Sequence, residues 1–227
     1  MFIHLESRRR ARGPWATVLL VATCVAMFLW IASGDPASRA RLLTVWGTVP
    51  SAIIDDAAPW LTQLAELRFA RLVTALFIHA DWLHLTTNLL FLVIFGVPAE
   101  RALGFRRFLL LFVLGGALAN LVGALTLAGT HAPIVGSSGA VWCVVGAYLA
   151  LFPRARLGLV LPLGVFLEFV RIPAPLLIGF WVVLQVLFTY VGPTFGAVAW
   201  WTHIAGFFIG IAFAILSRPA IGRRLRN

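Results

Sequence analysis

The chain has 227 residues, of which 61% are hydrophobic and 11% charged, whereas soluble domains carry about 25% charged residues. A water-soluble globule of this composition would expose large apolar patches. The high apolar content, aperiodic glycine and two cysteines exclude disordered, collagen-like and disulfide-scaffold classes. All 18 basic residues are arginine, and the net charge is +10. Because the arginines stand at the ends of apolar runs, we expect a polytopic membrane protein rather than a nucleic-acid binder.

In chain order, the apolar runs predict six membrane-spanning helices, since one span needs about 20 apolar residues. The first run follows a basic segment and could be a cleaved signal peptide, but its length favours a retained helix. Residues 34–78 are expected to form a folded, partly amphipathic loop at the membrane interface. Two prolines interrupt the stretch 157–190, so residues 157–173 are expected near the surface. The expected helices are residues 15–33, 83–97, 108–128, 138–152, 174–190 and 198–216.

The arginine positions predict the orientation of the chain. With the N-terminus inside and six crossings, fourteen arginines fall on the inner side and four on the outer side, as the positive-inside bias requires. The outer set is Arg39, Arg41, Arg68 and Arg71. We therefore predict an all-α, six-helix membrane bundle with both termini in the cytoplasm. It consists of a basic segment (1–14), a membrane domain (15–216) and a basic tail (217–227).

Intramembrane polar residues are informative because each is costly unless it is paired or faces water. The second, fourth and sixth expected helices all begin on the outer side, and their first turns carry His84 and Asn88, Ser138, and His203. The fourth helix spans only about 22 Å at 1.5 Å per residue, so Ser138 is expected several Å below the outer surface. The loop 130–136 must then dip into the membrane, where irregular backbone needs a water-filled or protein-buried setting.

A serine and a histidine at one depth suggest a nucleophile and its base. In the Gly-Ser-Ser-Gly motif at 136–139, small residues let a peptide backbone approach, and the helix N-terminus offers a free N–H to an oxyanion. His84 and Asn88 are spaced i and i+4, so they project from one helix face and could donate to the same oxyanion. No acidic residue is placed to orient His203, which favours a Ser-His dyad over a triad.

These motifs resemble those of rhomboids, the family of intramembrane serine proteases. They are His79-x4-His84-x3-Asn88, Gly136-Ser137-Ser138-Gly139, and Ala-Trp-Trp-Thr-His-Ile-Ala-Gly-Phe-Phe-Ile-Gly at 199–210. The resemblance covers nearly the whole chain and implies that Ser138 is the nucleophile and His203 the base. It further implies that His84, Asn88 and the Ser138 N–H stabilise the oxyanion. Substrates would be transmembrane proteins, entering between the second and fifth helices and cleaved near the outer face without metal or cofactor.

Other matching positions have supporting roles in this resemblance. The supporting set is Gly136, Gly139, Trp142, Gly206, Gly210 and His79. Gly206 and Gly210 match a Gly-x3-Gly pattern that packs the sixth helix on the fourth, and His79 is expected to be structural or to retain water. The chain also departs from the family pattern at three places. Trp142 replaces a frequent Tyr, Ala70 replaces the Trp of a Trp-Arg pair, and Ala102 takes the place of an arginine that is shifted by one.

Each candidate also has a structural alternative. Ser138 could be a small packing residue, His203 a satisfied core histidine, and Asn88 an interhelical hydrogen-bonding residue. At the level of function, a non-catalytic rhomboid-like protein would bind membrane helices, although such relatives usually lack the serine or the histidine. A second alternative is a metal or haem membrane protein, which would use the histidines as ligands. A third is a transporter, whose sequence would be expected to show inverted repeats.

We expect a multi-pass serine endopeptidase of the cell membrane, in a bacterial cytoplasmic membrane. Its expected partners are transmembrane protein substrates and the lipid bilayer, not nucleic acid, and no oligomeric state is predicted.

Overall fold

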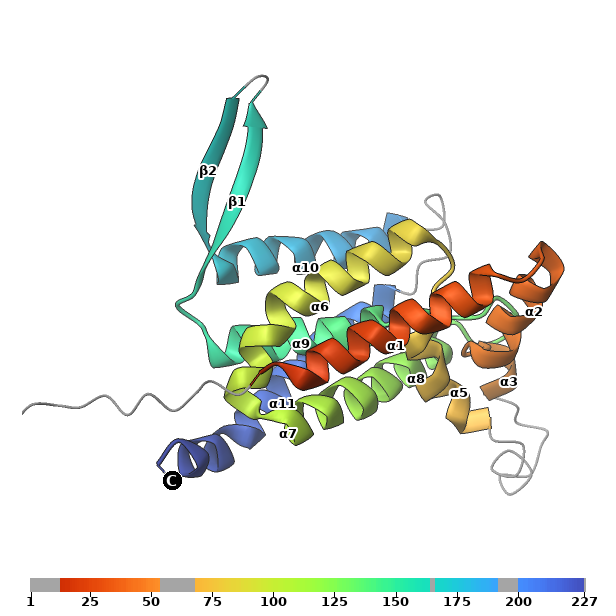
Figure 1. Ribbon diagram of the computed structural model, residues 1–227, viewed down its shortest axis with the longest axis horizontal. Helices are drawn as coiled ribbons and strands as arrows, with labels where there is room; N and C mark the ends of the chain where they lie inside the picture. The colour runs from red at the N-terminus through yellow and green to blue at the C-terminus, as the bar shows by residue number, and fades with distance from the viewer. Residues whose placement is uncertain (1–12, 54–67, 164–165, 192–199, 227) are drawn as a thin grey trace, which may run out of the picture.

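The computed structural model describes residues 13–53, 68–163, 166–191 and 200–226. Within these ranges the protein is a helical bundle from which one two-stranded β hairpin projects (Figure 1). Four helical stretches are long and apolar enough to cross a membrane: Trp15–Ala32, Trp82–Leu103, Phe105–Thr126 and Trp200–Ile221. Two shorter apolar helices are Ser138–Leu151 and Ala174–Leu187. The chain is therefore a multi-pass membrane protein.

Seven helices and one π-helical turn build the bundle. They are α1 (Trp15–Ala32), α6 (Trp82–Leu103), α7 (Phe105–Leu110), the π-helical turn η3 (Leu111–Gly115), α8 (Gly116–Thr126), α9 (Ser138–Leu151), α10 (Ala174–Val191) and α11 (Trp200–Arg226). Short helices follow α1: α2 (Pro36–Trp46), α3 (Pro50–Ile53), η1 (Arg68–Ala70), α5 (Arg71–Thr74) and η2 (Ala75–Phe77). The hairpin pairs β1 (Arg156–Leu163) with β2 (Phe166–Pro173) in antiparallel register.

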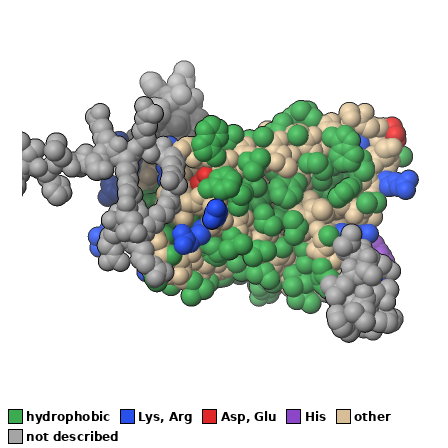
Figure 2. Space-filling view, turned by 60° about the horizontal axis from the view of Figure 1, so that its bottom comes forward, with side chains coloured by type: hydrophobic (Ala, Val, Ile, Leu, Met, Phe, Trp, Pro, Cys, Tyr) green, Lys and Arg blue, Asp and Glu red, His purple; other side chains and the backbone are tan. Residues whose placement is uncertain are grey.

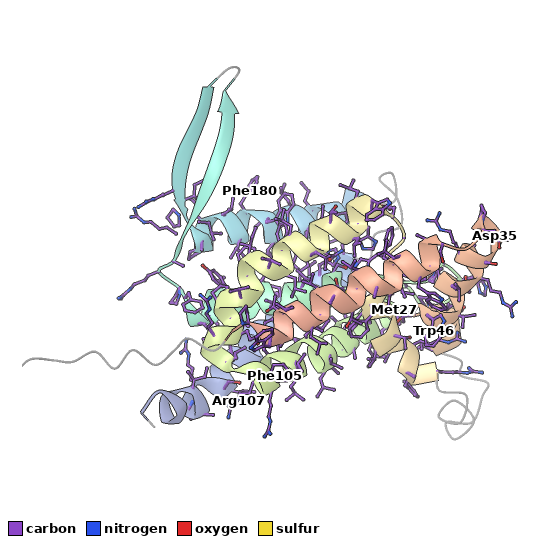
Figure 3. All side chains as sticks on the ribbon, viewed as in Figure 1. Met27, Asp35, Trp46, Phe105, Arg107 and Phe180 are labelled. Atoms are coloured by element: carbon purple, nitrogen blue, oxygen red, sulfur yellow. The ribbon has the colours of Figure 1, made fainter. Side chains whose placement is uncertain are left out.

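The long helices alternate in direction (Figure 1). α6, α9 and α11 begin at the end of the bundle that carries α2, α3 and α5, and α1, α7 and α10 begin at the opposite end. Asp35 and Trp46 lie at the first end, and Phe105 and Arg107 lie at the second (Figure 3). The described chain thus starts and finishes at the same end of the bundle, the one where α11 ends.

The outer surface of the bundle is apolar. Figure 2 shows hydrophobic side chains over the middle of the visible face, with most of its arginines toward the two ends. Trp15, Leu83 and Leu216 are 68%, 74% and 80% exposed. Apolar side chains of this size would be unfavourable in water at such density, so this surface suits contact with lipid.

The centre of the bundle is α9, most of whose side chains are buried. α11 packs against it at very short range, because a Cβ on Gly206 would collide with the carbonyl oxygen of Gly139, and one on Gly210 with that of Cys143. Glycine at both positions therefore lets the two backbones touch. Phe95 of α6 packs edge-on against Tyr148 near the other end of α9, with ring centroids 5.1 Å apart.

A buried carboxylate joins α6 to the beginning of α1. Glu100 is 3% exposed, and its oxygens accept hydrogen bonds from the backbone N–H groups of Ala16 and Thr17 and from the Thr17 hydroxyl, each at 2.8 Å. The first N–H groups of a helix have no partner within the helix. Glu100 supplies those partners from another helix, and α1 has no acidic residue in its own first turn.

The structure corrects several expected boundaries. The second helix, expected at residues 83–97, continues as α6 through Pro98 to Leu103, where Glu100 contacts α1. The expected basic tail (217–227) is helical as far as Arg226. The third expected helix starts earlier, at Phe105, directly after Gly104, whose φ of 86° turns the chain. Residues 198–199, expected to open the sixth helix, lie outside the described residues.

One connecting region differs from the sequence expectation. The segment expected near the surface before α10 is the β hairpin, so the chain is mostly helical and not all-α. Its apolar residues show no polar alternation, and therefore gave no strand signal. After α1, in the region expected as a folded loop, Asp35 caps α2 by accepting hydrogen bonds from the N–H groups of Ala37 and Ser38.

Candidate active site

Ser138 is the first residue of α9, at the end of a loop that crosses the bundle. The loop is held from both sides: Ile134 pairs with Thr48 through two backbone hydrogen bonds, and the N–H of Gly136 donates to the carbonyl of Ala75. Gly136 has a φ of 103°, and a Cβ there would also collide with Nε2 of His84. Only glycine meets both requirements without strain. Gly136 and Ser137, directly before Ser138, are thus buried in protein, which irregular backbone inside a membrane requires, whereas residues 128–132 of the loop are exposed.

The packing of α11 on α9 also sets the position of His203. Gly206 faces Gly139 and Gly210 faces Cys143, so the two helices run side by side in a fixed register. His203 stands one helical turn before Gly206 and is thereby brought level with Ser138. Nε2 of His203 and the Ser138 hydroxyl oxygen are 2.8 Å apart, a hydrogen-bonding distance.

Three further side chains hold the His203 ring. Trp142 stacks on it, with centroids 6.2 Å apart and planes 24° from parallel. Trp200 packs edge-on at 5.9 Å. Nδ1, the second ring nitrogen, lies 2.8 Å from Oε1 of Gln185 on α10. The Trp that replaces the family's frequent Tyr thus occupies a position against the histidine.

Gln185 was not among the residues selected from the sequence. The selection covered polar residues in the first turns of three helices, whereas Gln185 lies late in the fifth apolar run. The signal that could have found it is the one used for the others, since a polar side chain inside a predicted span is costly without a partner.

His84 and Asn88 lie on α6, near the loop that leads to Ser138. Asp81 caps this helix by accepting from the His84 N–H at 2.8 Å, which places the His84 ring beside Gly136. Asn88 is buried, and its Nδ2 donates to the His84 carbonyl one turn earlier at 2.7 Å. One of the two Asn88 amide hydrogens is therefore used within α6, and the second is the one available to a ligand.

His79 contacts Ser137, the neighbour of the candidate nucleophile. Its Nε2 is 3.2 Å from the Ser137 hydroxyl oxygen and accepts from the Ser137 N–H at 3.4 Å. Burial, reinforced by the adjacent His84 ring, lowers the pKa of His79 to about 3. The ring is accordingly neutral and its Nε2 is free to accept, so His79 fixes the backbone just before Ser138. His131, by contrast, is exposed and lies 3.0 Å from the Ser51 hydroxyl.

Comparison with known proteins assigns this fold to a family. The model of the Rhomboid domain matches residues 66–220. "Putative rhomboid protease YdcA" of Bacillus subtilis (strain 168) is 35% identical over 160 residues, which cover 70% of this chain and 74% of that protein. "RHOMBOID-like protein 6, mitochondrial" of Arabidopsis thaliana is 36% identical over 175 residues, or 64% of this chain and 56% of that protein.

A shorter match extends to animals. "Rhomboid-related protein 3" of Homo sapiens is 40% identical over 80 residues, which cover 35% of this chain and 19% of that protein. The chain therefore spans about half of the Arabidopsis relative and a fifth of the human one.

The helices define a multi-pass membrane protein with a serine and a histidine hydrogen-bonded between two of its central helices. This chain belongs to the rhomboid family.

Proposed function

We propose that this protein is an intramembrane serine endopeptidase that cleaves transmembrane segments of membrane proteins near the outer face, using Ser138 and His203 as a dyad. The observation that carries the proposal is the 2.8 Å separation of His203 Nε2 and the Ser138 hydroxyl oxygen. A serine hydroxyl becomes a strong nucleophile only when an adjacent base takes its proton. The membership of the chain in the rhomboid family supports the same chemistry.

The reaction is an acyl transfer in two halves. The Ser138 oxygen attacks the carbonyl carbon of the scissile peptide while its proton passes to Nε2 of His203. The tetrahedral intermediate then expels the amine, which leaves with that proton, and an acyl-enzyme ester remains on Ser138. Water attacks the ester, giving a proton to His203, and the serine is released with the proton returned to its oxygen.

The oxyanion of the intermediate needs donors that point to where its charge develops. We assign the Ser138 N–H, the His84 ring and the remaining amide hydrogen of Asn88 to this role. The first belongs to the start of α9, where backbone N–H groups lack helical partners. The other two come from α6, on which the His84 ring lies beside Gly136 and Asn88 lies one turn further along.

The proposal includes a setting in the membrane. The chain crosses six times, through α1, α6, α7–α8, α9, α10 and α11, with both termini in the cytoplasm of a bacterial cell. Arg107 and Asp35 lie at opposite ends of the bundle (Figure 3). In the proposed orientation, the end that carries Arg107 and the beginning of α1 is cytoplasmic, and the end that carries α2 and Asp35 is the outer one. Substrate helices reach Ser138 laterally from the bilayer, between α6 and α10.

A fluorophosphonate probe tests the dyad, because it reacts with a serine whose hydroxyl is activated. The purified protein in lipid should be labelled, and labelling should be lost in Ser138→Ala and in His203→Ala while both variants remain folded. Full labelling of either variant would exclude the dyad. A folded wild-type protein that is not labelled would favour the second candidate, a non-catalytic rhomboid-like protein that binds membrane helices.

A further inference from the structure

The second polar partner of His203 comes from a helix whose outer face is apolar. On α10, Phe180, Val183 and Leu187 are 59%, 65% and 53% exposed, and Phe180 points away from the bundle (Figure 3). Gln185 on the same helix is 4% exposed, and its Oε1 lies 2.8 Å from Nδ1 of His203. A buried amide in a lipid-facing helix is costly unless it is paired, and the contact with His203 pairs the amide oxygen of Gln185.

The contact determines which nitrogen of His203 carries the proton. A neutral imidazole has one N–H and one acceptor nitrogen. Nε2 faces the Ser138 hydroxyl and must be the acceptor if it is to take the serine proton. The ring proton then belongs on Nδ1, where the carbonyl oxygen of Gln185 is positioned to accept it. In the other tautomer, Nε2 would carry the N–H and could not take the serine proton. The lone pair of Nδ1 would then face the oxygen of the Gln185 amide, which is repulsive.

We propose that Gln185 is a positioning residue that holds His203 in its Nδ1–H tautomer, with Nε2 directed at Ser138. The inference rests on the proposed function and extends it from a dyad to a serine, a histidine and a neutral orienting amide. The two aromatic contacts, with Trp142 and Trp200, restrict the tilt of the ring, but neither distinguishes one nitrogen from the other. Gln185 alone among these three contacts selects the tautomer.

A neutral acceptor has a further consequence for the reaction. When Nε2 takes the serine proton, the imidazolium keeps its Nδ1–H bond to the amide oxygen. A carbonyl dipole stabilises this cation less than a carboxylate would. Gln185→Glu therefore keeps the acceptor and adds a charge, whereas Gln185→Met keeps the length of the side chain and removes the amide.

The first test needs no turnover. The side-chain nitrogens of the protein in lipid are observed by 15N NMR, and His203 is assigned among the five histidines by the signals lost in His203→Ala. We expect a protonated Nδ1 and an unprotonated Nε2 in the wild-type protein, and a mixture of tautomers in Gln185→Met. A neutral His203 that carries its proton on Nε2 in the wild-type protein would overturn the inference, even if Gln185→Met does not fold.

The second test separates positioning from binding. Inactivation by the fluorophosphonate is measured over a range of probe concentrations, which gives the limiting rate constant and the half-saturating concentration separately. Gln185→Met should lower the limiting rate constant about 10- to 100-fold, part of the roughly 10²–10⁴ that general-base catalysis contributes, and leave the half-saturating concentration unchanged. Gln185→Glu should restore the rate and move its acidic limb to higher pH, because the added charge favours the protonated ring.

Val183→Ala is the matched control, since it changes an exposed side chain of the same helix and should leave both constants unchanged. A Gln185→Met protein with the wild-type rate constant and pH profile would refute the positioning role while the dyad stands. If the wild-type protein is not labelled at Ser138, the proposed function fails, and the nitrogen spectra still decide whether Gln185 selects the tautomer.

Discussion

The link between Glu100 and the start of α1 can be tested by removing one acceptor at a time. One carboxylate oxygen accepts from the Ala16 N–H, and the other accepts from both the N–H and the hydroxyl of Thr17. In Glu100→Gln one of these oxygens becomes an NH2 group, which is a donor. Whichever way the amide turns, at least one buried backbone N–H of α1 faces another donor.

The expected loss follows from the number of bonds. A hydrogen bond to a charged group contributes about 1.5–3 kcal/mol net, so Glu100→Gln should lower the free energy of unfolding by about that amount. Glu100→Ala removes all three bonds and should cost about 4 kcal/mol or more, at the upper end for a single substitution. Thr17→Val removes only the hydroxyl donor to the same carboxylate and should cost about 1.5–3 kcal/mol.

Unfolding by sodium dodecyl sulfate in mixed micelles, followed by tryptophan fluorescence, measures these differences. The cycle of single and double variants is the control: Thr17→Val should cost little in the Glu100→Ala background, because the acceptor of its hydroxyl is already gone. A Glu100→Gln protein with the wild-type free energy of unfolding would refute the reasoning, as would full additivity of Thr17→Val and Glu100→Ala.

Two further predictions concern the packing and the chemistry of the site. Gly210→Ala should lower both thermal stability and fluorophosphonate labelling, because its Cβ collides with the Cys143 carbonyl and overpacking costs about 1–3 kcal/mol. Gly179→Ala on α10, where a Cβ meets nothing within 4 Å, should be neutral or slightly stabilising; equal losses at both positions would contradict the close packing. Asn88→Ala should reduce turnover of a cleaved substrate by about 10²-fold if the amide stabilises the oxyanion. Unchanged turnover in the folded variant would leave Asn88 a packing residue of α6.

Much of the helical arrangement could be predicted from the sequence because the length of an apolar run is a strong signal for a membrane-spanning helix. α9 begins at Ser138, where the Gly-Ser-Ser-Gly motif marks a junction between loop and helix. Local signals did not determine where α6 ends, because Pro98 indicates a stop and the contact of Glu100 with α1 is tertiary. The β hairpin was missed for a similar reason, since its pairing joins two apolar segments without alternation.

The candidate site shows the same division between local and tertiary information. Ser138 and His203 could be selected because each opens a helix with a polar side chain at similar depth, and the structure brings them to 2.8 Å. The orientation of the Asn88 amide could not be predicted from the sequence, because its Nδ2 also donates to the His84 carbonyl of the same helix. Gln185 required knowledge of which face of α10 meets α11.

The depth of Ser138 follows from packing at the far end of its helix. The contact of Phe95 with Tyr148 aligns α6 with α9, which run in the same direction. Ten residues earlier, about 15 Å at 1.5 Å per residue, α9 reaches Ser138 and α6 reaches Leu85, next to His84. α6 itself begins before that level, at Trp82. α9 has 14 residues and therefore spans only about 21 Å, less than the hydrocarbon core of about 30 Å.

Because α9 is short, we expect its N-terminus to lie below the outer surface of the membrane, with the loop 127–137 on its outer side. The loop is not helical directly before α9, which leaves the Ser138 N–H without a helical partner. Its last two residues, Gly136 and Ser137, are buried, and lipid could not satisfy their backbone groups. Gly136 lets it turn beside His84, and His79 holds Ser137. The short central helix α9 thus explains why Ser138 lies level with His84, and why the loop before it needs Gly136 and the contact with His79.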